Sequence, residues 1–187
     1  MAREETGLVA SVKQGVVSAV QGAGDIASAV VDAISTTVAT TIGGLGNVAS
    51  SLVSATADVA QGTLEAVMEV GGDLGFAAKG IILGVLRGAK KAGAATLETI
   101  SQTSGAVIKS TAAVAGDVGT AAKGLVEGAV QGAREVGLDV TEAASAAATG
   151  ALKAAGEVGS EAGTTVRNAL TGTIAGVKVV LKEPFKK

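Results

Sequence analysis

The sequence repeats an eleven-residue pattern of apolar residues over almost its whole length. Five of the eleven positions, represented by Leu8, Val9, Val12, Val16 and Val48, hold no charged residue from there to the polar C-terminal tail. An eleven-residue repeat corresponds to about 3.67 residues per helical turn, so every eleventh residue returns to the same line along a helix. The five columns then form one apolar arc of roughly 160°, which is wider than a two-helix coiled-coil seam.

The register of this repeat is not disturbed by any insertion or deletion, whereas a loop between packed helices usually shifts it. The chain of 187 residues equals seventeen such repeats. We therefore expect an all-α fold: one very long amphipathic helix or a few long helices, non-globular and ordered through assembly. A single uninterrupted helix would span on the order of 280 Å.

The repeat also sets the segment boundaries that we expect. Residues 1–7 form a polar N-terminal cap, residues 8–181 a continuous amphipathic helical region and residues 182–187 a polar tail. A superrepeat of four elevens relates 70–113 to 114–157.

Glycine limits how stable such a helix can be alone. The chain has 28 Gly, each of which weakens a helix by about 1 kcal/mol relative to Ala. Helicity must therefore come from a surface or a partner. The weakest helical stretches, at 35–46 and 99–111, are where we expect bends. The single proline, Pro184, lies in the polar tail.

The larger side chains of the five charge-free columns define the expected lipid-binding or assembly face. We call this set the apolar face: Val9, Val12, Val16, Val20, Val31, Ile34, Val38, Ile42, Val53, Leu64, Val70, Leu74, Ile81, Ile82, Val85, Leu86, Leu97, Ile108, Val114, Val118, Leu125, Val126, Val130, Leu152, Val158, Val166, Leu170 and Ile174.

One column beside this face carries only positive charge. This basic edge consists of Lys13, Lys79, Lys90, Lys123, Arg134, Arg167 and Lys178. Its ammonium groups could reach lipid headgroups while the stems lie on apolar surface. Alternatively, the edge is solvated and pairs with acidic columns of neighbouring helices. A separate column, which includes Asp73, Asp117 and Asp139, carries only negative charge.

Glycines at GxxxG spacing lie near the opposite border of the face, which is built from Gly, Ala, Ser and Thr. This spacing lets another backbone approach closely. The residues that we expect in close helix packing are Gly80, Gly84, Gly88, Gly124, Gly128 and Gly132.

The residues that most catalytic sites use are missing. The chain has no His, Cys, Trp or Tyr, which removes the imidazole base, the thiol nucleophile and the usual transition-metal ligands. We expect no enzyme, no cofactor, no metal and no small-molecule substrate. The motif at 22–27 imitates a dinucleotide fingerprint, but residues 33–57 contain no acidic residue to complete it. A net charge of −2 argues against nucleic acid as a partner.

The uncharged span from 33 to 57 is long enough to cross a bilayer. Ser, Thr and Asn are frequent within it, which favours a segment that lies on a surface or packs against a partner over a crossing. The N-terminus lacks the pattern of a secretory signal. We therefore expect a cytoplasmic protein, or one peripheral to a membrane or lipid body.

This pattern resembles the eleven-residue-repeat proteins with amphipathic helices: the synucleins, the perilipins, the exchangeable apolipoproteins with their longer, doubled units and the late-embryogenesis-abundant proteins. The segment Ala77-Ala78-Lys79-Gly80 and its copy at 121–124 are similar to the synuclein repeat core. The proline punctuation of the apolipoproteins is missing. The resemblance implies a helix that lies along a lipid or granule surface.

Three functions follow from the pattern. The first is a non-enzymatic structural protein whose long helices self-associate laterally into an array that covers or encloses an apolar surface, lipid foremost. The second is a protein-only filament, tube or bundle in which the apolar faces pack on each other. The third is a membrane-inserted glycine-zipper assembly. The expected partners are further copies of the chain and lipid or another apolar surface.

Overall fold

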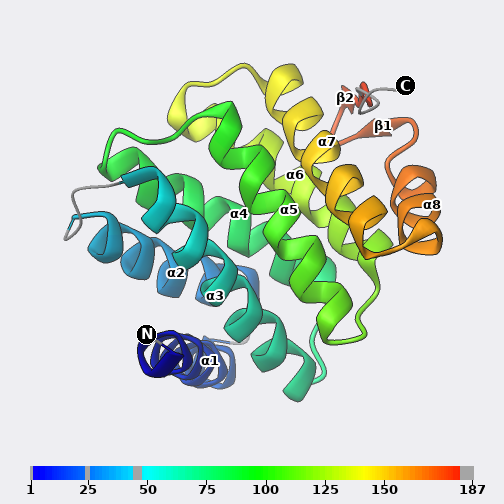
Figure 1. Cartoon of the computed structure of the whole chain (residues 1–187). Helices are drawn as coiled ribbons and strands as arrows, with labels where there is room; N and C mark the ends of the chain where they lie inside the picture. The colour runs from blue at the N-terminus through cyan, green and yellow to red at the C-terminus, as the bar shows by residue number, and fades with distance from the viewer. Residues whose placement is uncertain (1, 24–25, 44–47, 182–187) are drawn as a thin grey trace.

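The computed structural model describes residues 2–23, 26–43 and 48–181, and within them it contains eight α-helices and one β-hairpin (Figure 1). The helices are α1 (Ala2–Ala23), α2 (Ile26–Gly43), α3 (Val48–Glu69), α4 (Leu74–Lys91), α5 (Leu97–Ala113), α6 (Val118–Val136), α7 (Val140–Val158) and α8 (Ser160–Ala169). Strands β1 (Thr173–Ile174) and β2 (Val177–Lys178) pair antiparallel, with Ile174 opposite Val177. The described fold is all-α apart from this hairpin.

The helices stack in two layers, each made of every second helix. In one layer α4 packs between α2 and α6, and α8 follows α6; in the other, α3 packs on α1, α5 on α3 and α7 on α5. Figure 1 shows the chain advancing across the molecule from α1 in blue to α8 in orange. The helix pair α4–α5 lies within residues 70–113, and the pair α6–α7 covers 114–157 with α7 ending one residue beyond, at Val158; each pair adds one step to the stack.

The turns that end α3, α4, α5 and α6 share one geometry. Their left-handed residues are Gly71, Gly93, Ala115 and Gly137, with φ of 70°, 68°, 54° and 86°. In each turn the next N–H donates to the carbonyl five residues earlier, as from Gly72 to Val67, at 2.8–2.9 Å. This is the Schellman arrangement, in which a residue at positive φ closes the helix C-terminus. The four left-handed positions follow one another at a constant interval of two elevens.

The acidic column marks the starts of helices. The carboxylates of Asp73, Asp117 and Asp139 accept hydrogen bonds from backbone N–H groups in the first turns of α4, α6 and α7. Bonds from the backbone and hydroxyl of Thr120 hold the pKa of Asp117 below its ordinary value. Thr96 caps α5 in the same way. Such side chains satisfy N–H groups that have no partner within the helix.

The structure differs from the expected long helix, because the described helices have between 10 and 22 residues. An undisturbed register does not require a continuous helix. From α4 to α6, one helix and its turn together occupy two elevens, so the turn lies inside the period and the register continues beyond it.

Several expected boundaries also differ. Residues 99–111 lie inside α5, so that stretch is not a bend. The other stretch, 35–46, contains the end of α2 at Gly43, and its residues 44–46 lie outside the described residues. In α2 the hydroxyls of Thr36, Thr37 and Thr40 donate to carbonyls four residues earlier. Residues 2–7 belong to α1, and the region expected to be continuous helix ends in the hairpin.

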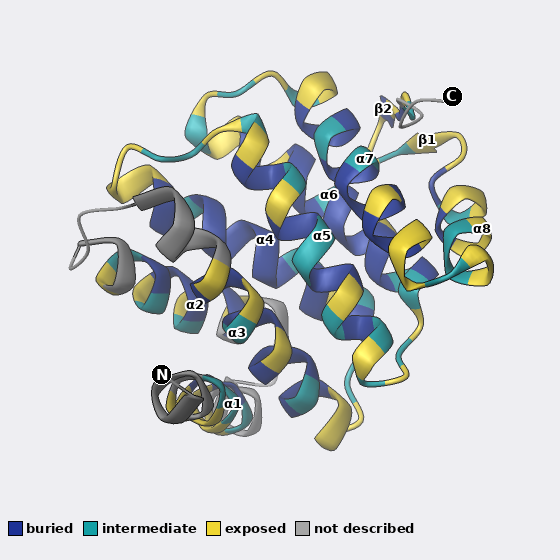
Figure 2. Cartoon of the chain, in the orientation of Figure 1, coloured by how far each residue is buried: buried dark blue, intermediate teal, exposed yellow. Residues whose placement is uncertain are grey.

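The core is built from the apolar columns. The largest fully buried side chains all belong to the five charge-free columns; they are Ile34, Leu64, Ile81, Ile82, Leu86, Ile100, Ile108, Leu125, Leu170, Val16, Val30 and Val38. Figure 2 shows buried residues on the facing sides of the helices and exposed residues on the outer sides. The chain therefore has a core of its own, which differs from the non-globular chain that we expected to be ordered only through assembly.

Candidate functional site

The apolar face lies mainly inside the stack. Eighteen of its residues are buried: Val12, Val16, Val31, Ile34, Val38, Leu64, Leu74, Ile81, Ile82, Val85, Leu86, Ile108, Leu125, Val126, Val130, Leu152, Val166 and Leu170. Partly buried are Val9, Val70, Leu97, Val114, Val118 and Ile174, whereas Val158 is exposed. The side chains of Val20, Ile42 and Val53 lie outside the described residues. The face that we expected to meet lipid or other copies packs here against other helices of the same chain.

This core has few large side chains and contains polar groups without hydrogen-bond partners. Among the described residues, its largest members are Ile and Leu, and Phe76 is 55% exposed at the start of α4. The hydroxyls of Thr56, Thr63, Ser104 and Thr149 are buried without a hydrogen-bond partner. A buried polar group without a partner costs about 1–3 kcal/mol. Few large side chains and unpaired hydroxyls both reduce the stability of the closed stack.

The basic edge contributes contacts between helices of one layer. The ammonium group of Lys13 lies 2.9 Å from the Glu69 carboxylate, and that of Lys79 lies 4.0 Å from Glu127. Lys90 donates to the backbone carbonyl of Glu135 at 2.6 Å. The hydrogen bond from Lys13 to Glu69 raises the pKa of the lysine.

The remaining basic-edge residues lie farther along the chain. Lys123, Arg134, Arg167 and Lys178 are exposed on α6, α8 and β2. Lys13, Lys79 and Lys90 thus contact neighbouring helices, and the other four edge residues are solvent-exposed.

Two further ion pairs join residues that the sequence pattern did not single out. The Arg87 guanidinium donates to both carboxylate oxygens of Glu135, at 2.7 and 3.0 Å. Lys109 lies 2.6 Å from Glu157. These bonds lower the pKa of Glu135 and of Glu157. In both pairs the acidic residue follows the basic residue by the length of the superrepeat plus one helical turn. This shared offset is the sequence feature from which the two ion pairs could have been predicted.

The predicted packing glycines lie between helices of the same layer. In α4, a Cβ on Gly84 would stand 2.7 Å from Ile34 Cβ, and one on Gly88 would stand 2.8 Å from Val38 Cβ, both in α2. Gly124 meets the backbone of Gly75, and Gly128 and Gly132 meet Ile82 and Leu86; Gly80 is also buried. These glycines allow close approach within one chain.

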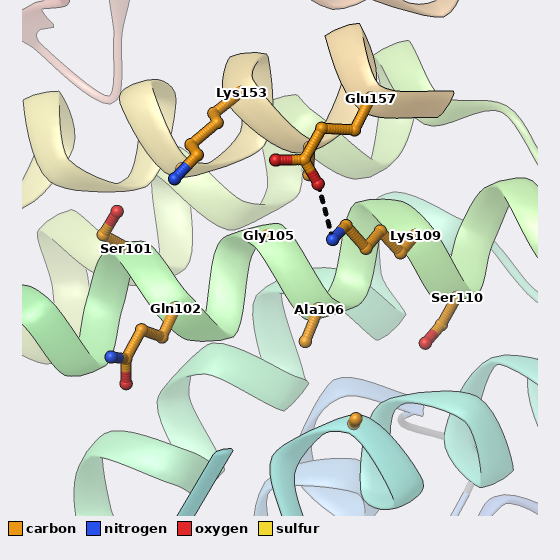
Figure 3. A pocket seen from close by; sticks show the side chains of 11 residues that line it. Ser101, Gln102, Gly105, Ala106, Lys109, Ser110, Lys153 and Glu157 are labelled. Atoms are coloured by element: carbon orange, nitrogen blue, oxygen red, sulfur yellow. Dashed lines mark ion pairs between the residues drawn. The ribbon is translucent and has the colours of Figure 1, made fainter. Parts of the chain in front are cut away.

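A surface groove of about 410 Å³ lies between α5 and α7 (Figure 3). Its walls carry Gly105 and Ala106 from α5 and Gly150 and Ala154 from α7, and Ala57 of α3 also lines it. Lys109, Lys153 and Glu157 stand at its polar rim, where Figure 3 shows the Lys109–Glu157 pair. The sequence pattern did not predict this groove.

The structure also bears on four other features of the sequence. No group of three or more His, Cys, Asp or Glu side chains there could hold a metal ion. Asp139 is engaged with the backbone of Thr141 and Glu142. None of the described helices combines the length and the apolar character that crossing a membrane requires. Part of the 22–27 motif, Gly24 and Asp25, lies outside the described residues.

Comparison of the chain with protein-family models, with curated proteins and with solved structures finds no match.

Proposed function

We propose that the protein is a non-enzymatic structural protein whose stack opens at its turns and spreads its apolar face over lipid or another apolar surface, where copies associate laterally. The observation that carries this proposal is the constant spacing of the left-handed turn residues, which lie two elevens apart. It lets one sequence form either the closed stack or a continuous apolar face.

The register explains how both forms are possible. At about 3.67 residues per turn, two elevens complete six helical turns. If the turn at Gly93 became helical, the apolar columns of α4 would continue in line into those of α5. Glycine can adopt both the left-handed and the helical backbone conformation. Opening therefore needs new backbone angles at a few residues, while the helices on either side persist.

The same driving force favours the closed and the open form. The apolar face is buried in both forms, against other helices in the closed stack and against the apolar surface in the open chain. This burial is the main favourable contribution to the free energy in each case. The closed stack holds buried hydroxyls without partners, such as those of Thr63 and Ser104. An apolar surface therefore competes with a core that is not packed with large side chains. Binding of the open form to lipid would shift the population toward it.

The charges fit an interfacial helix as well. Lys13 and Lys79, which pair with acids of neighbouring helices in the closed stack, would lie along one border of the open face. Lysine stems can lie on apolar surface while their ammonium groups reach anionic headgroups. The exchange from protein to lipid partners thus involves the basic edge as well as the apolar face.

An engineered disulfide between α5 and α7 tests whether opening is needed. A Cβ at position 105 would lie 3.7 Å from the Cβ of Ala154, and disulfides favour about 3.8 Å. The chain has no Cys, so the pair Gly105→Cys with Ala154→Cys can form one defined bridge. We expect the oxidised protein to lose co-sedimentation with vesicles of phosphatidylglycerol and phosphatidylcholine in equal parts, and reduction to restore it.

The reduced double variant and an oxidised Gly105→Cys single variant are the matched controls. Circular dichroism should show that the oxidised form keeps its helices. Equal vesicle binding by oxidised and reduced protein would refute opening between α5 and α7. Failure of every form, wild type included, to bind vesicles would refute the lipid coat.

A protein-only assembly is the second candidate, and the stacking itself favours it. The pairs α4–α5 and α6–α7 add to the stack through the same kinds of neighbour contact, so the architecture can in principle be extended by another copy. Light scattering and negative-stain microscopy of lipid-free protein test this candidate. Concentration-dependent rods would support it, whereas monomers at every concentration would exclude it.

A further inference from the structure

The groove between α5 and α7 exists because both of its walls lack large side chains. A Cβ on Gly105 would be 3.6 Å from the carbonyl oxygen of Gly150 and 3.7 Å from the Cβ of Ala154, so it would make ordinary van der Waals contacts with α7. In the other layer, by contrast, the Ile82 and Leu86 side chains fill the space at Gly128 and Gly132. At Gly150, however, a Cβ would collide with the backbone of Ser101, so α5 and α7 are in close contact there, and the space that remains for a ligand is the surface groove along the two helices.

The chemistry of the groove is divided between an apolar lining and a cationic rim. The apolar lining consists of Gly105, Ala106 and Ala154 in the two walls, together with Ala57. At the rim Lys109 pairs with Glu157, whereas Lys153 forms no ion pair within the described part of the chain. The rim thus has two cations and one anion, although the chain as a whole has a net charge of −2. In Figure 3, Lys153 extends from α7 toward the Ser101 end of α5, while Lys109 meets Glu157 farther along the groove.

We infer that this groove binds a single-chain anionic amphiphile, a long-chain carboxylate. Its carboxylate would lie at Lys153, and its hydrocarbon chain would cover Gly105, Ala106 and Ala154. Small-molecule sites have volumes of about 300–1,000 Å³ and combine an apolar lining with a few polar groups that orient the ligand. The groove, at about 410 Å³, lies within this range.

This site belongs to the closed stack, whereas the proposed coat requires the open chain. The carboxylate site and the lipid coat can therefore be refuted independently of each other. A ligand that binds only the closed form also stabilises it, so the carboxylate would raise the midpoint of thermal unfolding.

Titration calorimetry of the full, lipid-free chain with dodecanoate, kept below its micelle concentration, tests the inference. We expect saturable binding of one molecule per chain. Dodecanol, which has the same chain but no charge, should bind more weakly, and acetate should not bind.

Two substitutions address the two halves of the site. Gly105→Leu places a side chain in the groove and should abolish binding while leaving vesicle co-sedimentation intact. Lys153→Gln should weaken dodecanoate binding about fivefold, since one exposed ionic contact is worth up to about that factor, and should leave dodecanol binding unchanged. Lys123→Gln, an exposed lysine on α6 away from the groove, is the matched control.

Several results would overturn the site. Dodecanoate that binds Gly105→Leu as tightly as wild type would place the ligand elsewhere. Equal losses in Lys153→Gln and Lys123→Gln would indicate non-specific attraction. Binding of many molecules per chain without saturation would indicate partition onto exposed apolar faces. If circular dichroism shows that Gly105→Leu is misfolded, Gly105→Val provides a smaller obstruction, and its undiminished binding would count equally against the inference.

Discussion

Gly128 in α6 lies directly on the backbone of Lys79 in α4: a Cβ at position 128 would be 2.8 Å from the Lys79 carbonyl oxygen. This distance is too short for a real Cβ contact, so Gly128→Ala must separate the two helices. Overpacking of this kind costs about 1–3 kcal/mol. We expect the free energy of unfolding, measured by urea denaturation followed by circular dichroism, to fall by that amount.

Gly156→Ala is the matched control for this prediction. Gly156 lies in α7, and a Cβ there would meet nothing within 4 Å. Ala is a better helix former than Gly by about 0.5–1 kcal/mol, so this variant should be more stable than wild type. If both glycine variants changed stability in the same direction, close helix packing at Gly128 would not be the cause.

The eleven-residue period predicted which residues are buried far better than it predicted where helices end. Ile82, Val126 and Leu125 are in charge-free columns and fully buried, because burial follows the periodicity of side chains along the helix. The period does not say whether the burying partner is lipid, another copy or the same chain. That choice depends on whether the chain can reverse direction without disturbing the columns.

The turns at which the chain reverses direction also follow a period in the sequence. Gly71, Gly93 and Gly137 are left-handed and lie two or four elevens apart; Asp73 and Asp139 cap the helices that follow Gly71 and Gly137, whereas Thr96 caps the helix that follows Gly93. A glycine that ends a helix and an aspartate two residues later that begins the next form a turn signal. The signal is hidden because Ala115 replaces glycine at one of the four positions and because other glycines lie within helices.

Acid should destabilise the closed stack through Glu135. Its hydrogen bonds with Arg87 hold its pKa below the ordinary value of 4.5. A carboxyl group with a lower pKa in the folded chain contributes stability above its unfolded pKa, and this contribution is lost as the pH falls through the folded pKa. We expect the free energy of unfolding to be level near neutral pH and to fall below about pH 4.5. Glu135→Gln should flatten this fall.

The exposure of the pair limits the size of the effect to less than about 1 kcal/mol. Urea unfolding at several pH values, compared between wild type and Glu135→Gln, measures it. Glu98→Gln, on the exposed side of α5, is a control whose acid transition should match that of wild type. Parallel curves for wild type and Glu135→Gln would show that the Arg87 pair does not couple folding to pH.

The unpaired hydroxyl of Thr63 gives a prediction of the opposite sign. Thr63 is fully buried in α3, and its hydroxyl has no hydrogen-bond partner. Thr63→Val keeps the shape and removes the unsatisfied group, so it should raise the free energy of unfolding by about 1 kcal/mol. Thr164→Val is the control, because the exposed Thr164 hydroxyl donates to the Ser160 carbonyl. A destabilised Thr63→Val would mean that the hydroxyl has a partner, such as a buried water.

The two kinds of turn residue allow a direct test of opening. Gly93 and Ala115 occupy equivalent left-handed positions, with φ of 68° and 54°. A left-handed conformation costs a non-glycine residue about 1–2 kcal/mol. Gly93→Ala therefore weakens the closed turn and, because Ala favours helix, also stabilises the open form. Ala115→Gly instead relieves the strain of the closed turn and, because Gly disfavours helix, destabilises the open form.

These effects add in the equilibrium between closed and open chains. We expect Gly93→Ala to strengthen vesicle binding roughly tenfold and Ala115→Gly to weaken it by a similar factor. The two variants should also shift urea unfolding in opposite directions, with Ala115→Gly the more stable. Gly156→Ala raises helix propensity outside the four left-handed turns and provides the comparison for that effect alone. If Gly93→Ala and Ala115→Gly changed stability as expected but left vesicle binding equal, lipid binding would not proceed through the turns, and the closed stack itself would be the form that meets the membrane.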